Sequence, residues 1–235
     1  MAEPENIQEL MEQSDRCSKE KKWKEGAELL SSYHDTDNPQ LLWRIVRDLY
    51  RTSKYFSKDA GEAEELARNG LELAKKALSL DSTSYLCYKW AGIILSHHSG
   101  LVGQKEKIAS AVQVREYFEK AIELNPNDMP SKHLLGRWHY NVASVPWYVR
   151  SAAKLIYSSP PTSTYEEALK HFEAAEKLNK QEFVDNWLYL AKTYYQLSDK
   201  VQAKKWASTV CEFKGASSPA IVEAKTECEH LLGKL

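Results

Sequence analysis

The chain has 235 residues, of which 43% are hydrophobic and 28% are charged, as expected of a globular protein with a sizeable core. This composition excludes a disordered or fibrous chain, because such chains lack apolar residues or repeat a very short motif. The formal net charge of −1 excludes binding of polyanions through overall charge. Any attraction to an acidic partner must therefore come from how the charges are arranged.

The N-terminal residues and the apolar runs indicate a soluble protein. Residues 1–6 are polar and acidic, and the longest apolar run, from Trp90 to Leu95, is too short to span a bilayer. We expect no signal peptide and no integral membrane segment. The four cysteines form no CxxC pair, which favours a reducing compartment and packing in the core over disulfides. They are Cys17, Cys87, Cys211 and Cys228.

The first predicted elements are a pair of helices between about Asn6 and Ser32. This part of the chain is acidic, because the first forty residues carry ten Asp and Glu against five Lys and Arg. Pro39 follows, and proline commonly marks a boundary between helices. The pair is expected to cap the N-terminal end of the segments that follow.

From residue 39 onward, large and small residues recur with a period of about 34 residues. The most complete copy has Trp187 in one predicted helix and Ala203 in the next, with every intermediate position at its expected offset. Three earlier copies follow the same spacing. Their marker residues are Trp43, Val46, Tyr50, Ala74 and Ala77 in the first copy; Gly92, Phe118, Ala121 and Pro126 in the second; and Leu135 and Gly136 in the third, which directly follows Pro126.

This spacing is typical of tetratricopeptide repeats, in which small residues let two helices approach closely and large residues fill the remaining space. It predicts an all-α fold, a right-handed solenoid of degenerate tetratricopeptide repeats with capping helices. We expect a single domain over 1–235, with a helix pair in 1–38, repeats with inserted loops in 39–212 and a C-terminal capping helix in 217–235. The insertions are expected at Tyr50–Ala63, Ser99–Gly103 and Val145–Thr164.

The sequence carries no strong catalytic motif, so we expect a protein that is not an enzyme. Its carboxylates lie mostly beside lysines three or four positions away, as on solvated helix faces. His97, His98, His133 and His139 lack the spacing of metal ligands and are expected to face solvent or a groove. We therefore predict no metal and no cofactor.

The middle of the chain is basic. Residues 129–165 contain no Asp or Glu but hold Lys132, Arg137, Arg150 and Lys154, and residues 82–104 also lack acids. Aromatic residues accompany these cations. Trp138, Trp147 and Tyr148 could pack in the core or contact a ligand, and we expect core packing. A basic middle surface implies an acidic partner.

In such solenoids, positions 5, 9 and 12 of each first helix line the concave groove. Here these twelve positions hold five cations, one anion, one His and two Tyr. The anion is Asp48, and the remaining three positions hold Ile93, Ser96 and Leu188. We predict a basic, tyrosine-lined groove for carboxylate-rich peptides or phosphate groups, with a simple solvated face as the alternative. The predicted partner-binding residues are Arg44, Arg51, Lys89, His133, Arg137, Tyr140, Lys192 and Tyr195.

Several longer strings are more particular than the repeat pattern. They include Leu41-Leu42-Trp43-Arg44, the stretch from Tyr117 to Pro126, Pro146-Trp147-Tyr148 and the linker from Pro160 to Glu166. On these strings, and over roughly residues 38–210, the chain resembles the regulator of microtubule dynamics family.

The resemblance implies binding to microtubules, with tubulin as partner, and a role at the spindle and spindle poles in chromosome segregation. It places the protein in the cytoplasm and on the cytoskeleton. Because the family also includes a phospholipid-binding tether, the alternative is an anionic phospholipid-binding module, with a cavity between Trp43, Trp90 and residues 145–157. Nucleic acid is not an expected partner, since the chain lacks an RNA-binding motif and a strongly basic balance.

Overall fold

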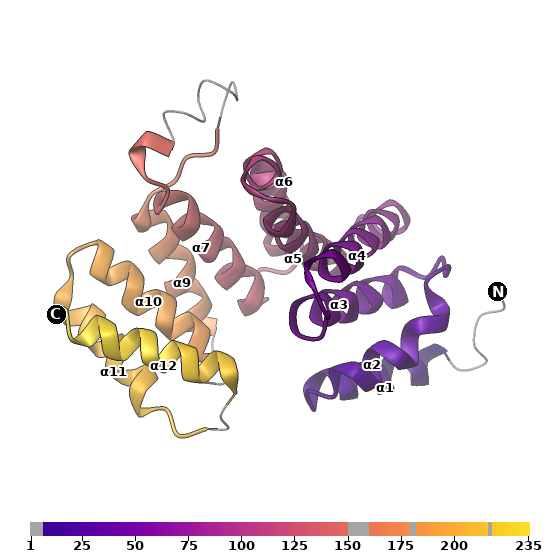
Figure 1. Cartoon of the computed structure of the whole chain (residues 1–235), viewed down its shortest axis with the longest axis horizontal. Helices are drawn as coiled ribbons and strands as arrows, with labels where there is room; N and C mark the ends of the chain where they lie inside the picture. The colour runs from indigo at the N-terminus through magenta and orange to yellow at the C-terminus, as the bar shows by residue number, and fades with distance from the viewer. Residues whose placement is uncertain (1–6, 150–159, 179–181, 216–217) are drawn as a thin grey trace. The chain divides into compact units, whose positions relative to one another are not determined.

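The computed structural model describes residues 7–149, 160–178, 182–215 and 218–235, and within these ranges the ordered elements are helices without a strand (Figure 1). The chain divides into two compact units, Met1–Pro126 and Asn127–Leu235. The division falls at the proline that ends one predicted repeat. The single-domain organisation stays a prediction.

The first unit contains the predicted N-terminal helix pair and two helical hairpins. The pair is α1 with α2, the hairpins are α3 with α4 and α5 with α6, and α4 also packs against α5. The bounds are α1 Ile7–Lys19, α2 Trp23–Leu30, the short 3₁₀ helix η1 Ser31–Tyr33, α3 Pro39–Tyr55, α4 Ala60–Leu80, α5 Tyr85–Val102 and α6 Gln104–Leu124.

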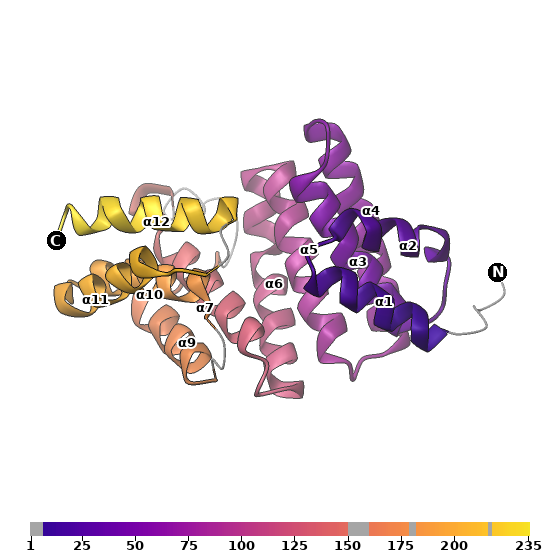
Figure 2. The same ribbon diagram turned by 90° about the horizontal axis from the view of Figure 1, so that it is seen from below.

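The second unit contains two further hairpins and the predicted C-terminal cap. Helix α7 packs with α9, and α10 packs with α11, while α12 lies beside both α10 and α11 (Figure 2). The bounds are α7 Met129–Ala143, α9 Tyr165–Leu178, α10 Val184–Gln196, α11 Lys200–Glu212 and α12 Pro219–Leu232.

Seven of the described helices begin where the sequence supplies a capping side chain. In α3, the Asn38 side chain accepts hydrogen bonds from the amides of Gln40 and Leu41, which satisfies two donors that no helical carbonyl reaches. Pro39 follows as the first helical residue, where its missing N–H costs nothing. The seven caps are Asn38, Asp59, Ser84, Asp128, Thr164, Asp199 and Ser218.

Each unit has its own apolar core. In the first, Leu41, Ile45 and Leu49 of α3 pack with Leu30, and Leu42 and Trp43 pack with Ala77 and Cys87 on the adjoining side. In the second, two clusters of buried residues join the helices, one around Phe172 and one beneath α12. Their buried members are Tyr140, Ala168, Phe172 and Leu190, and then Val184, Leu188, Ala191, Ala207, Val210, Ala224, Cys228 and Leu231.

The first two expected insertions lengthen helices. Helix α3 continues through Tyr55, so that only residues 56–59 separate it from α4. Helix α5 continues through Val102, and Gly103, with φ of 131°, is the one residue between α5 and α6. Glycine suits this position because other residues rarely adopt such a φ. Of the third insertion, residues 150–159 lie outside the described part of the chain.

Among the described helices, none is both long enough and apolar enough to cross a bilayer.

Candidate functional site

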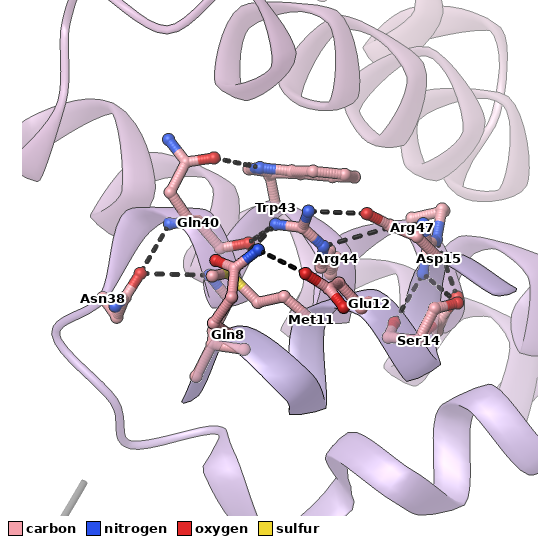
Figure 3. Close-up of polar contacts among 12 residues, drawn as sticks. Gln8, Met11, Glu12, Ser14, Asp15, Asn38, Gln40, Trp43, Arg44 and Arg47 are labelled. Atoms are coloured by element: carbon pink, nitrogen blue, oxygen red, sulfur yellow. Dashed lines mark hydrogen bonds and ion pairs between the residues drawn. The ribbon is translucent and has the colours of Figure 1, made fainter. Parts of the chain in front are cut away.

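The first predicted groove residue, Arg44 of α3, forms a fork with Asp15 of α1 (Figure 3). Its Nε and Nη2 lie 3.1 and 2.6 Å from the two carboxylate oxygens of Asp15. Arg47, one turn further along α3, places Nη1 2.8 Å from Oδ1 of the same carboxylate. Paired contacts of this kind are the strongest form of arginine–carboxylate hydrogen bonding. The N-terminal helix thus supplies the anion that these arginines hold.

The rest of this polar interface continues toward the C-terminal end of α3. Arg47 also donates to the backbone and side chain of Ser14, and its Nε lies 3.0 Å from Oδ1 of the buried Asp48. Arg51 donates to Ser18 at 2.9 Å. Burial and then the Arg47 charge lower the pKa of Arg51 to about 10. The basic positions of α3 therefore face α1.

Lys89 of α5 is buried, with 8% of its surface exposed, and its ammonium lies 5.2 Å from the centre of the Tyr85 ring. Arg44, Arg51 and Lys89 all belong to the first unit and are all at least partly enclosed. The contacts of Arg44 and Arg51 join α3 to α1.

Four predicted residues come together in the second unit around a ring that sequence reasoning did not select, Tyr189. The Arg137 guanidinium lies 5.0 Å from the Tyr189 ring centre, and the Lys192 ammonium lies 5.3 Å from it and 5.8 Å from the Tyr140 ring. The His133 ring lies 5.7 Å from the Tyr189 ring. A cation held over an aromatic face is stabilised by the ring's electron density. We call Arg137, Tyr140, Tyr189 and Lys192 the α7–α10 face.

Two carboxylates accompany these cations. Asp185 lies 3.3 Å from Arg137, and Glu227 of α12 lies 2.7 Å from Lys192. Counting groove positions missed both, because Asp185 lies outside the three positions and Glu227 belongs to the capping helix. The side chains are partly open to solvent, with exposed fractions of 38% for Arg137, 29% for Lys192, and 43% and 41% for the two carboxylates.

His133 was predicted to face solvent or a groove, but it is buried, with 2% of its surface exposed. Its Nδ1 lies 3.1 Å from the Asn186 side-chain oxygen and its Nε2 lies 2.8 Å from Asp185. His133 thus orients the carboxylate that pairs with Arg137. Tyr195 packs on the edge of the cluster beneath α12.

The electrostatics of the α7–α10 face favour a charged Lys192. Burial lowers the pKa of Lys192, but the hydrogen bond and charge of Glu227 more than offset this, and the net shift is upward. Burial raises the pKa of Tyr140. Both groups therefore keep their protons at neutral pH.

Of the three aromatic residues expected to pack in the core, one is buried and two are exposed. Trp138 is buried, as expected, but Trp147 and Tyr148 are 73% and 61% exposed, which corrects the expectation that they pack in the core. Arg150 and Lys154, part of the predicted basic stretch, lie outside the described residues.

His139 is also buried, against the expectation, and its Nδ1 lies 2.7 Å from the Ser163 hydroxyl. The His139 ring stacks on His171 with 5.0 Å between centres. Despite this pair, the described residues contain no group of three or more His, Cys, Asp or Glu side chains placed to hold a metal ion.

Comparison with known sequences identifies similar proteins over nearly the whole chain. The family profile described as Regulator of microtubule dynamics protein 1-3 matches residues 8–235. The chain is 36% identical over 226 residues to Regulator of microtubule dynamics protein 1 of Pongo abelii, covering 96% of this chain and 72% of that protein. The Bos taurus protein of the same name is 37% identical over 226 residues, covering 96% and 71%. That of Caenorhabditis elegans is 31% identical over 194 residues, covering 83% and 84%.

Solved structures with a similar arrangement of helices are tetratricopeptide-repeat proteins. A thermophilic TPR protein of Thermus thermophilus matches with a TM-score of 0.64 and 12% identity, covering 96% of this chain and 98% of that chain. YrrB, described as a TPR protein with an unusual peptide-binding site, matches with a TM-score of 0.50 and 13% identity, covering 96% and 91%. At such identities the likeness shows the fold, and the predicted all-α tetratricopeptide-repeat solenoid is confirmed.

Proposed function

The chain belongs to the regulator of microtubule dynamics family, and from this premise we propose that it is a microtubule-associated interaction protein. In this proposal it binds acidic segments of its partner, such as the glutamate-rich tails of tubulin, on the α7–α10 face. The proposal is one of binding without catalysis.

The observation that carries the proposal is the position of Arg137 and Lys192 beside the Tyr189 ring, each paired with a partly exposed carboxylate. Ion pairs this exposed contribute little to stability, so an incoming carboxylate can replace Asp185 or Glu227 at low cost. The ring holds both cations close to the surface without neutralising them. A flexible acidic peptide fits such a face.

The α3 arginines support the proposal in a different way. Arg44, in the first helix of its repeat, binds the Asp15 carboxylate through two hydrogen bonds, as a partner's carboxylate could be bound at an equivalent position. However, Arg44 is already paired with Asp15 of α1, and Lys89 is buried. Charge reversal there would test folding, and the binding test is therefore restricted to the second unit.

The test is co-sedimentation of the full chain with microtubules, intact or stripped of their acidic tails, over a series of salt concentrations. We expect pelleting that weakens with salt and with tail removal, because exposed charges are screened. The double variant R137E/K192E should weaken binding roughly tenfold or more, since both cations become repulsive. The matched control is K204E/K214E, which reverses two exposed lysines elsewhere in the second unit. Equal loss in both variants would mean that only overall charge matters.

Anionic liposomes serve as the parallel bait. Anionic phospholipid presents phosphate groups to the same cations, so flotation with liposomes and no pelleting with microtubules would replace the microtubule proposal with the lipid alternative. The lipid alternative keeps the cavity expected between Trp43, Trp90 and residues 145–157, of which residues 150–157 lie outside the described part of the chain.

We extend the proposal to the mitotic spindle and its poles, with a role in chromosome segregation and residence in the cytoplasm and on the cytoskeleton. Imaging of the tagged chain in dividing cells tests this part. A wild-type signal on the spindle that R137E/K192E loses would support it, and a wild-type signal absent from the spindle would overturn it.

A further inference from the structure

A second aromatic surface lies in the first unit, where the added length of α3 meets the start of α2. Trp23 begins α2, Tyr55 ends α3, and Phe56 follows directly. The Trp23 ring centre lies 5.1 Å from that of Tyr55 and 6.4 Å from that of Phe56. Tyr55 and Phe56 are 47% and 37% exposed. We call Trp23, Tyr55 and Phe56 the aromatic patch.

Each ring of the aromatic patch has a cation beside it. Lys24 lies 4.9 Å from the centre of Phe56, Arg51 lies 5.2 Å from Trp23, and Lys54 lies 5.1 Å from Tyr55. Such contacts hold the cations near the rings and leave their outward side to water. The aromatic patch therefore presents apolar area and positive charge together.

The lysines here differ from the cations of the α7–α10 face in one respect. Among the described residues, no carboxylate lies within ion-pair distance of Lys24 or Lys54, whereas Arg137 and Lys192 each have one. Arg51 retains Asp48 at 3.6 Å. An acidic ligand would thus meet two lysines from which it displaces no carboxylate.

We propose that the aromatic patch, with Lys24 and Lys54, is a docking surface for an acidic peptide segment that carries an aromatic side chain. Carboxylates of the segment pair with the two lysines, and its ring packs on the exposed edges of Tyr55 and Phe56. Aromatic pairs in edge contact contribute beyond the area that they bury. Complementary charge with adjacent apolar area is what such a segment needs.

Other classes of partner fit less well. A nucleic acid needs open ring faces for its bases, but cations already cover faces of Phe56 and Trp23. A membrane needs projecting rings, and Tyr55 and Phe56 are much less exposed than Trp147. This proposal rests on the proposed function only in that both name an acidic partner. The two surfaces are separate, because the aromatic patch belongs to the first unit and the α7–α10 face to the second.

The experiment measures binding of the full chain to a short fluorescent peptide of alternating glutamate and glycine that ends in tyrosine. Matched peptides replace the glutamates with glutamine or the tyrosine with alanine. We expect both replacements to weaken binding. The variants K24E/K54E and Y55S/F56S should each weaken it roughly tenfold, and because all four side chains are exposed they should fold normally, which a thermal melt checks.

Two control variants match these changes elsewhere. K204E/K214E reverses two exposed lysines, and V201S/V222S removes two exposed apolar side chains, Val201 and Val222. Both should bind the peptide as the wild type does. If the wild type ignores the peptide, or the patch variants bind it unchanged, the proposal is overturned. The proposal would also be overturned if the chain bound single-stranded RNA or anionic vesicles more tightly than the peptide and K24E/K54E abolished that binding. Those partners would then replace the peptide.

Failure here is distinguishable from failure of the proposed function. The variant R137E/K192E should retain peptide binding if the aromatic patch is the docking surface. Loss in that variant, with binding kept in K24E/K54E, would assign the acidic segment to the α7–α10 face and leave the microtubule proposal standing.

Discussion

Gly136 of α7 packs so closely against the ring of Phe172 in α9 that a Cβ atom added to the glycine would lie 2.8 Å from two ring carbons. Phe172 is fully buried, and it cannot move away without opening the core that joins the hairpin. The same relationship holds between Gly92 and Phe118 in the first unit. These are the small and large positions of the repeat pattern, and their contact sets how closely paired helices approach.

Gly136→Ala should therefore destabilise the second unit by about 1–3 kcal/mol, the usual cost of adding a methyl group to a packed core. Gly100→Ala is the matched control, because Gly100 lies within α5 and a Cβ there meets nothing within 4 Å. That change should be neutral or stabilise by up to about 1 kcal/mol, since alanine favours a helix. Urea unfolding followed by circular dichroism measures both. Equal effects of the two substitutions would contradict the packing argument.

The repeat pattern could be predicted because it records local spacing. Gly136 and Phe172 hold the same repeat positions as Gly92 and Phe118, so counting residues finds the hairpins, and Ser218 marks the start of the capping helix through its own chemistry. The residues that lengthen α3 show no such spacing in the sequence. The continuation of α3 to Tyr55 follows no repeat position, and sequence reasoning therefore expected a loop and missed the aromatic patch.

The charge of the groove could not be predicted for a related reason. Arg44 was expected to face a partner, but Asp15, 29 positions earlier, pairs with it, and Asp185 pairs with Arg137 from 48 positions away. Counting within one helix does not identify partners on a neighbouring helix. The prediction for His133 failed for the same reason, since the ring packs against Phe172 of α9 and its two nitrogens contact Asn186 and Asp185 of α10.

Asp15→Asn should loosen α1. Burial raises the pKa of Asp15, but hydrogen bonds from Arg44 and Arg47 more than offset this and leave the pKa below its usual value of 3.8. The carboxylate therefore contributes stability above about pH 4, and this is lost as pH falls through the lowered pKa. Because the side chain is 43% exposed, solvent screening limits the cost to about 1 kcal/mol.

Hydrogen exchange of the α1 amides at neutral pH measures this loosening. The control is Glu12→Gln, an exposed position on the same helix that contacts only Gln8 in Figure 3. Unchanged exchange in Asp15→Asn would mean that apolar contacts of α1 hold it in place without the ion pair.

Stability should rise between about pH 4 and pH 6.5 because of two histidines. Burial and then Lys54 lower the pKa of His97 to about 4, and burial and then His139 lower that of His171 to about 4, from 6.5. The unfolded chain binds these protons first, so stability is complete above pH 6.5 and is lost as pH falls toward 4. Because both rings are only partly buried, solvent screening limits the contribution of each to about 1 kcal/mol.

The hydrogen bonds of His97 suggest the variant that tests this. The Ser53 hydroxyl donates its proton to the Ala63 carbonyl at 2.6 Å, so His97 Nε2, 2.8 Å away, must donate to Ser53. Glutamine can keep this donor without titrating, and His97→Gln should flatten the pH dependence of urea unfolding. His230→Gln, at an exposed position on α12, controls for loss of an imidazole. A pH profile unchanged in His97→Gln would contradict the assignment.

The two buried cysteines should report the opening of each unit separately. Cys87 and Cys228 are 1% and 0% exposed, and burial raises the pKa of both thiols, that of Cys228 to about 12. Alkylation needs an exposed thiolate, so each should react only when its surroundings open, and more slowly than the partly exposed Cys17.

Because each unit has its own core, Gly136→Ala should accelerate alkylation of Cys228 and leave Cys87 unchanged, while Gly92→Ala should do the reverse. Mass spectrometry of labelled peptides over time, in native buffer, measures both rates in one sample. Acceleration of both cysteines by either substitution would instead show that the chain opens as one cooperative domain, which is the organisation that the sequence predicts.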